Sequence, residues 1–138
     1  LVDELDTIMN KQSGLLGISG KYSDARDIVS GWENGDERCI LARDMFVDRV
    51  VDYIAKYYFE MGGCDMIVFT AGMGEKSRPF RAEIMKRLGV IGIHLDEKAN
   101  ELCFGTEGMI STVDSKIPCY VIPTDEEVMI ARDAYNLL

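Results

Sequence analysis

The chain has 138 residues, which is enough for one compact domain and hardly enough for two. Hydrophobic residues make up 47% of it, a content that supports a folded core and excludes an intrinsically disordered protein. The net charge is −9, from 24 acidic against 15 basic residues, and the absence of a basic run argues against a nucleic-acid partner. No apolar run approaches the roughly 20 residues of a membrane span, so no membrane partner is expected.

The cysteines indicate a reducing environment. Cys39, Cys64, Cys103 and Cys119 are far apart and the chain has one histidine, which argues against a zinc site. Three of the four lie in apolar periodic segments, so reduced core thiols of a cytoplasmic protein are expected. The chain begins at Leu1 rather than Met and enters a helical pattern at once, which suggests a piece of a longer protein.

The first half of the chain is predicted to be helical. A short amphipathic helix is expected over residues 2–10, followed by a glycine-containing loop over residues 11–21. Ser23 is expected to cap a second helix, and residues 31–35 to form a turn in which the single tryptophan anchors local packing. Residues 36–61 contain no glycine or proline, and their apolar residues recur at three- and four-residue spacing. This pattern predicts one long helix, ended by a glycine pair.

Strands alternate with helices in the second half. Residues 67–70 are apolar or β-branched, which predicts a strand covered on both faces, and a helix is expected over about residues 77–88. Residues 89–95 and 108–112 are expected to be short extended segments, and residues 119–122 a second buried strand. The alternation predicts an α/β fold.

A terminal helix is expected from Glu126 to about Asn136. Its buried side is predicted to comprise Val128, Ile130, Ala131, Ala134 and Tyr135.

The turn after the first strand is the first candidate site. Gly72 and Gly74 permit a sharp turn and a close backbone approach to a ligand, and the amides that follow can face phosphate or ribose oxygens. Ligands of open α/β sheets settle at the carboxyl ends of strands, where this turn lies. An ordinary strand-to-helix turn explains the two glycines equally well. The turn lacks the third glycine of a dinucleotide fingerprint and the Gly-Lys-Ser/Thr ending of a P-loop.

Two further candidates consist of charged residues. Asp125, Glu126 and Glu127 follow the second buried strand, where they either stabilise the helix N-terminus or help to hold Mg²⁺. Arg26 either binds a phosphate or a base, or forms a surface ion pair with Asp24 or Asp27.

Together, these segments resemble the acetate kinases in their amino-acid sequence and in their order along the chain. The likeness lies in residues 10–20 (N-K-Q-S-G-L-L-G-I-S-G) with 23–27 (S-D-A-R-D), 68–75 (V-F-T-A-G-M-G-E), 107–116 (E-G-M-I-S-T-V-D-S-K), and 121–127 (V-I-P-T-D-E-E) with 130–132 (I-A-R). It covers essentially the whole chain and corresponds to roughly the last third of the family's sequence.

The resemblance implies a fold and an activity. Acetate kinases transfer the γ-phosphoryl group of ATP reversibly to acetate, giving acetyl phosphate and ADP with Mg²⁺, and share a ribonuclease-H-like fold with actin and sugar kinases. It implies that residues 1–138 are the C-terminal nucleotide-binding domain of a two-domain kinase, which pairs into a homodimer through this domain. By position, Asp24, Ala25, Arg26, Gly72, Met73, Gly74, Glu75 and Lys76 would line the nucleotide, and Glu126 would contribute to the Mg²⁺ site.

Departures from the family pattern bear on the site. Lys76 replaces the usual asparagine, and Ala25 stands where a larger residue is common. The family's catalytic arginines, aspartate and histidine precede the segment that this chain resembles, so no catalytic residue is expected here and the chain is expected to be inactive alone. A propionate or butyrate kinase, or a free-standing non-catalytic nucleotide-binding or interaction module, remains an alternative.

Overall fold

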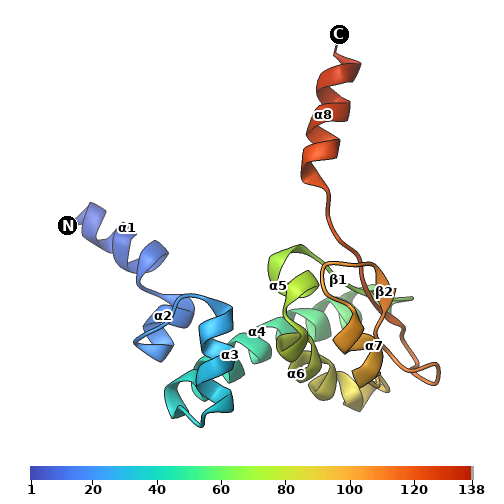
Figure 1. The fold of residues 1–138 in the computed structure, drawn as a ribbon, viewed down its shortest axis with the longest axis horizontal. Coiled ribbons are helices and arrows are strands. Elements are labelled where there is room, and N and C mark those ends of the chain that lie inside the picture. Colours follow the sequence, from blue (N-terminus) through green and yellow to red (C-terminus); the bar gives the residue numbers. More distant parts are fainter. Residues whose placement is uncertain (138) are drawn as a thin grey trace.

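A small mixed sheet organises the second half of the chain (Figure 1). A computed structural model describes residues 1–137, in which strands β1 (Ile67–Phe69), β3 (Cys119–Val121) and β2 (Gly108–Met109) form one sheet in that order. β1 runs parallel to the central strand β3, with Ile67 opposite Cys119, and β2 pairs antiparallel with β3. The carboxyl ends of β1 and β3 therefore lie next to each other at one edge, where ligands of α/β sheets bind.

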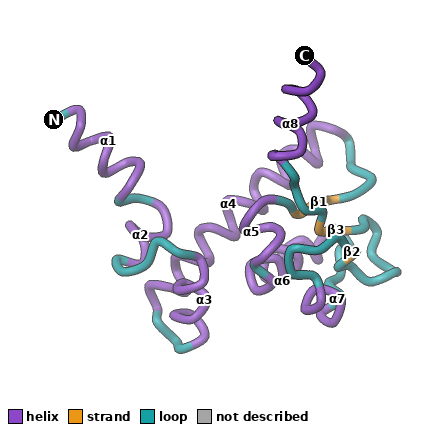
Figure 2. Tube along the Cα trace, turned by 45° about the horizontal axis from the view of Figure 1, so that its top comes forward, coloured by secondary structure: helices purple, strands orange, loops and turns teal. Residues whose placement is uncertain are grey.

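Helices form most of the remaining structure, as the tube in Figure 2 shows. They are α1 (Val2–Lys11), α2 (Gly14–Ser19), α3 (Ala25–Glu33), α4 (Glu37–Met61), α5 (Ala71–Lys76), α6 (Arg78–Leu88), α7 (Glu97–Leu102) and α8 (Glu126–Asn136), with a 3-10 turn at Gly89–Ile91.

The long helix α4 connects the two halves of the molecule. Helices α2 and α3 pack on it, and so does α6 from the sheet side. The Asp36 carboxylate caps α4 by accepting hydrogen bonds from the backbone N–H groups of Arg38 and Cys39, at 3.0 and 3.3 Å. Gly62 ends it with a left-handed φ of 72°, as the glycine pair predicts.

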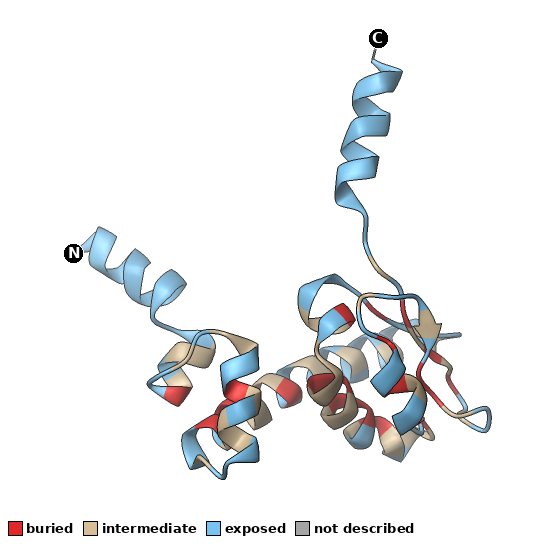
Figure 3. Cartoon of the chain, viewed as in Figure 1, coloured by how far each residue is buried: buried red, intermediate tan, exposed pale blue. Residues whose placement is uncertain are grey.

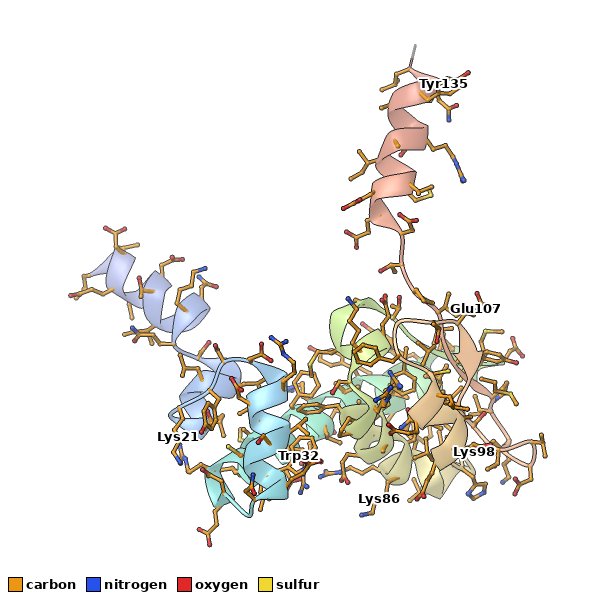
Figure 4. All side chains as sticks on the ribbon, viewed as in Figure 1. Lys21, Trp32, Lys86, Lys98, Glu107 and Tyr135 are labelled. Carbon is orange, nitrogen blue, oxygen red and sulfur yellow. The ribbon has the colours of Figure 1, made fainter. Side chains whose placement is uncertain are left out.

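An aromatic cluster joins α3, α4 and α6. The ring of Phe80 makes edge-to-face contacts with Trp32 at 5.0 Å and with Phe46 at 5.1 Å between centroids. Trp32 lies between α3 and α6 in Figure 4, so the expectation that it anchors packing is confirmed. The expectation of a turn over residues 31–35 is wrong in part, because α3 continues to Glu33.

Other local expectations also need correction. The loop expected over residues 11–21 contains the short helix α2, and the helix expected from about residue 77 is preceded by a separate helix, α5. Residues 89–91 form a 3-10 turn rather than extended chain. In β1, Val68 is exposed, so this strand is covered on one face and not on both.

The two terminal helices form where they were expected, but the burial predicted for one side of α8 is wrong (Figure 3). α1 and α8 project away from the rest of the chain, and neither contains a buried residue. The residues expected on the buried side of α8 are all exposed, and Figure 4 shows Tyr135 near the outer end of that helix. An apolar stripe predicts which side of a helix will pack, but packing also requires a second surface.

The cysteines match the expectation of reduced thiols. Cys39, Cys103 and Cys119 are buried, Cys64 is partly buried, and all four are free. Burial raises the pKa of the Cys119 thiol to about 11. Within residues 1–137, no helix combines the length and the apolar character that a membrane crossing requires.

The Phe80 cluster should dominate stability. Phe80 is 1% exposed, so F80A is expected to lower the free energy of unfolding by about 3–5 kcal/mol through lost transfer energy and a residual cavity. Urea unfolding followed by Trp32 fluorescence measures it. F59A is the control, because Phe59 is 80% exposed and its loss should cost less than about 0.5 kcal/mol. Equal effects of the two substitutions would contradict the assignment.

Candidate functional site

A pocket lies where the N-terminus of α3 meets α5 and α6. Its volume is about 580 Å³. The lining residues come from three segments of the chain: Asp24, Ala25, Arg26 and Val29; Gly72, Met73, Lys76, Ser77 and Pro79; and Phe104. The structure thus brings together two of the candidate segments, residues 24–26 and residues 72–76, that are far apart in the sequence.

Asp24 and Arg26 form the rim of the pocket. Asp24 caps α3, because Oδ1 accepts from the Arg26 backbone N–H at 2.8 Å, so the cap is Asp24 and not Ser23. The Arg26 side chain donates from Nε to Oδ1 at 3.0 Å and from Nη2 to Oδ2 at 2.6 Å. These bonds lower the pKa of the Asp24 carboxyl to about 2. Arg26 thus forms the ion pair foreseen as the alternative, at 89% side-chain exposure, while still lining the pocket.

In the turn after β1, the glycines do not provide the left-handed backbone conformation. The residue with a left-handed backbone is Ala71, with φ of 57°, and neither Gly72 nor Gly74 has a positive φ. Gly74 is required for another reason: a Cβ there would lie 3.0 Å from the carbonyl carbon of Phe69, so glycine lets α5 pack directly on β1. A Cβ on Gly72 would meet open space, because this residue faces the pocket.

Glu75 points away from the pocket and joins the two parallel strands at their carboxyl ends. Its carboxylate accepts hydrogen bonds from the backbone N–H of Thr124 at 3.0 Å and from Thr124 Oγ1 at 3.1 Å. The Thr124 N–H is the main cause of the lowered pKa of the Glu75 carboxyl. Of residues 72–76, therefore, Gly72, Met73 and Lys76 line the pocket, whereas Gly74 and Glu75 support α5 from behind.

Arg81 holds together the backbone segments that carry two walls of the pocket. It is 1% exposed and donates from Nη1 to the carbonyls of Gly74 and Glu75, at 2.8 and 2.9 Å. Its other nitrogens donate to Asn100 Oδ1 and to the carbonyls of Asn100 and Cys103, at 2.8, 3.1 and 2.6 Å. These bonds connect the last turns of α5 and α7. Burial of the guanidinium lowers the pKa of Arg81. The oxygens that accept its side-chain hydrogen bonds are all neutral.

The sequence pattern did not single out Arg81 or Phe104 as residues of the site. Arg81 lies three, four and seven residues before Ile84, Met85 and Leu88, which are all buried, so a charge on an apolar helical stripe was the available signal. Phe104 carried no comparable signal, because it is an isolated aromatic residue after α7.

Glu126 lies apart from the pocket. It is the first residue of α8 and is exposed, while Asp125 caps that helix by accepting from the Val128 N–H at 3.0 Å. Over residues 1–137, no group of three or more His, Cys, Asp and Glu residues is arranged to hold a metal ion. One carboxylate near substrate phosphates is nevertheless a donor set that Mg²⁺ accepts, with water completing the shell.

Comparison with known proteins identifies the family. The sequence profile of the acetokinase family matches residues 1–132. The chain belongs to the acetokinase family. It is 53% identical over 130 residues to the acetate kinase of Streptococcus thermophilus, covering 94% of this chain and 32% of that protein. With the acetate kinase of Clostridium novyi it shares 51% identity over 137 residues, covering 99% of this chain and 34% of the relative.

Solved structures of acetokinase-family members confirm the α/β fold. The acetate kinase of Porphyromonas gingivalis superposes with a TM-score of 0.88 at 40% identity, covering 99% of this chain and 34% of that one. A propionate kinase from Francisella tularensis gives 0.85 at 36% identity, with 95% and 33% covered. The fold is therefore the ribonuclease-H-like one expected from the resemblance. The chain spans about a third of the length of the relatives that it matches.

Replacement of Arg81 should loosen the pocket walls. R81M removes the Arg81 donors to four backbone carbonyls, of which the Glu75 carbonyl keeps the Gly105 N–H. A buried carbonyl left without a donor costs about 1–3 kcal/mol, so we expect a loss of more than about 3 kcal/mol in unfolding free energy. Native-state hydrogen exchange should accelerate around residues 73–77 and 103–105 more than in α4. R38M, at an exposed position of α4, is the control. A loss below about 1 kcal/mol with unchanged exchange would contradict this role.

Proposed function

We propose that residues 1–138 are the C-terminal nucleotide-binding domain of a longer acetate kinase, which transfers the γ-phosphoryl group of ATP reversibly to acetate. The observation that carries the proposal is the single pocket lined by both Asp24–Arg26 and the Gly72–Lys76 segment. Membership of the acetokinase family supports the reaction class. The chain contributes binding and no catalytic residue, so it is inactive by itself.

The chemistry of the pocket suits a nucleotide. Ala25, Val29, Met73 and Pro79 offer apolar contact for a base, while Arg26 and Lys76 supply positive charge in a chain whose net charge is −9. Phosphoryl transfer requires mainly positioning and neutralisation of charge, which groups of this kind provide. Lys76, in the place of the family's asparagine, would reach phosphate oxygens rather than hydrogen-bond as an amide.

Mg²⁺ would be held mainly by the phosphates of ATP or ADP, with Glu126 contributing one carboxylate directly or through water. Glu126 follows Thr124 by two residues, and Thr124 is bonded to Glu75 at the end of α5. This connection ties the start of α8 to the pocket-bearing helix.

Acyl specificity would be set outside this chain. The likeness to a propionate kinase supports propionate or butyrate as an alternative acceptor. A free-standing module that binds nucleotide or a partner without catalysis is the other alternative. The reduced, buried cysteines support a cytoplasmic location.

We also propose that the whole enzyme is a homodimer through this domain. Exposed residues recur every fourth position along α4 and form a largely apolar stripe that winds slowly around the helix, because four residues exceed one turn of 3.6. The stripe is interrupted only by Arg49 and comprises Leu41, Met45, Tyr53, Tyr57 and Met61. An exposed apolar stripe of this length is typical of an interface. Met61 is 65% exposed, which makes it available to such an interface.

Blocking the pocket should weaken nucleotide binding. G72L fills the pocket with a side chain whose Cβ meets no neighbour, so ATP affinity of the chain is expected to fall at least tenfold while stability is retained. G89L is the matched control, because Gly89 also has open space around its Cβ but lies outside the pocket. Isothermal titration with ATP, with and without Mg²⁺, measures the affinity.

The same titrations can contradict the proposal. No ATP binding by the unsubstituted chain, or equal binding by G72L and G89L, would exclude this pocket as the nucleotide site. E126Q should weaken the Mg²⁺-dependent part of the affinity alone. Hydroxamate formation from acetate and ATP by this chain by itself would refute the view that catalysis resides outside it.

Charge on the α4 stripe should prevent dimerisation. Y57E introduces a carboxylate at a half-exposed stripe position and is expected to convert a dimer to a monomer in sedimentation velocity. A55E places the same charge at an exposed α4 position off the stripe and should leave the dimer intact. A clean monomer for the unsubstituted chain at high concentration would overturn the dimer proposal.

A further inference from the structure

Phe104 is an exposed aromatic side chain on the wall of the pocket. It follows the C-cap residue of α7, Cys103, is 52% exposed, and shares the pocket with Ala25 and Met73. Large aromatic side chains are usually buried, since an exposed ring forgoes the stabilisation that removal from water provides. No other residue that lines this pocket carries an aromatic ring.

The ring of Phe104 is held by a cation. The guanidinium carbon of Arg78 lies 4.9 Å from the ring centroid, which is cation–π geometry. Arg78 is fixed in turn by an ion pair with Glu101 of α7, at 3.1 Å from Nη1 to Oε1. One side of the ring is thus supported by protein, and half of the side chain remains open to solvent.

The backbone on both sides of Phe104 is fixed to α5. Arg81 Nη2 donates to the carbonyl of Cys103 at 2.6 Å, and the N–H of Gly105 donates to the carbonyl of Glu75 at 3.0 Å. Arg81 also binds that same Glu75 carbonyl. The loop that carries the ring is therefore joined to the helix that carries Gly72, Met73 and Lys76. Restraint of the loop before binding lowers the entropy that a ligand contact would cost.

We propose that Phe104 is the base-stacking, specificity-determining residue of the pocket, and that its ring makes this chain favour purine over pyrimidine nucleotides. The inference rests on the proposed nucleotide-binding function. A flat apolar ring, backed by a cation and open on its remaining surface, matches the face of a nucleobase, and a two-ring purine offers it more stacking area than a pyrimidine. Arg26 and Lys76 are then available for the polar part of the ligand.

Titrations with two nucleotides test the assignment. The Kd values of ATP and UTP are measured by isothermal titration for the unsubstituted chain and for F104A, F104Y and F59A. We expect F104A to weaken ATP about tenfold or more and UTP much less, so that the preference for ATP collapses. F104Y retains the stacking surface and should keep the preference. F59A removes an exposed phenylalanine outside the pocket and should change neither affinity.

Several outcomes would overturn the inference. Equal loss of ATP and UTP affinity in F104A would mean that the ring only shapes the loop, and unchanged ATP affinity would mean that the base does not reach it. Loss of the preference in F104Y would also exclude stacking. No binding of either nucleotide to the unsubstituted chain would instead contradict the proposed function and the inference together. Trp32 fluorescence and circular dichroism verify that each variant is folded.

Discussion

The pocket depends on one buried guanidinium. Arg81 has almost no exposure, and its bonds reach the last turn of α5 and the last turn of α7 at once. Carbonyl groups at helix C-termini lack partners within the helix and carry partial negative charge, so a cation placed between two such ends satisfies both. Without it, the α5 wall and the Phe104 wall of the pocket would be joined by the hydrogen bond from the Gly105 N–H to the Glu75 carbonyl and would lose the five bonds of the guanidinium.

The carboxyl ends of the parallel strands provide the second constraint. β1 leads into α5, and β3 leads through Thr124 into α8, and Glu75 bonds one connection to the other. The low pKa of this carboxyl keeps it ionised and accepting. The end of α5 and the start of the segment that leads into α8 are therefore joined by two hydrogen bonds.

Local chemistry explains what was foreseen of the fold. The α4 helix was predictable because its apolar spacing, the Asp36 cap and the Gly62 terminator all lie within its own sequence. The exposure of α8 was not, because burial depends on a second surface that a periodic pattern does not contain.

The sequence by itself determined helices α1, α3, α4, α6 and α8, strands β1 and β3, and the resemblance by which residues 24–26 and 72–76 were selected. Only the tertiary structure decided which of those residues share a pocket: Gly72, Met73 and Lys76 do, whereas Gly74 packs on Phe69 and Glu75 binds Thr124. It also added Phe104 to the site and gave the left-handed turn to Ala71. The physical reason is the distance along the sequence over which each interaction acts. Caps and periodicity act within a few residues, while a pocket is made by contacts between segments that meet only when the chain has folded.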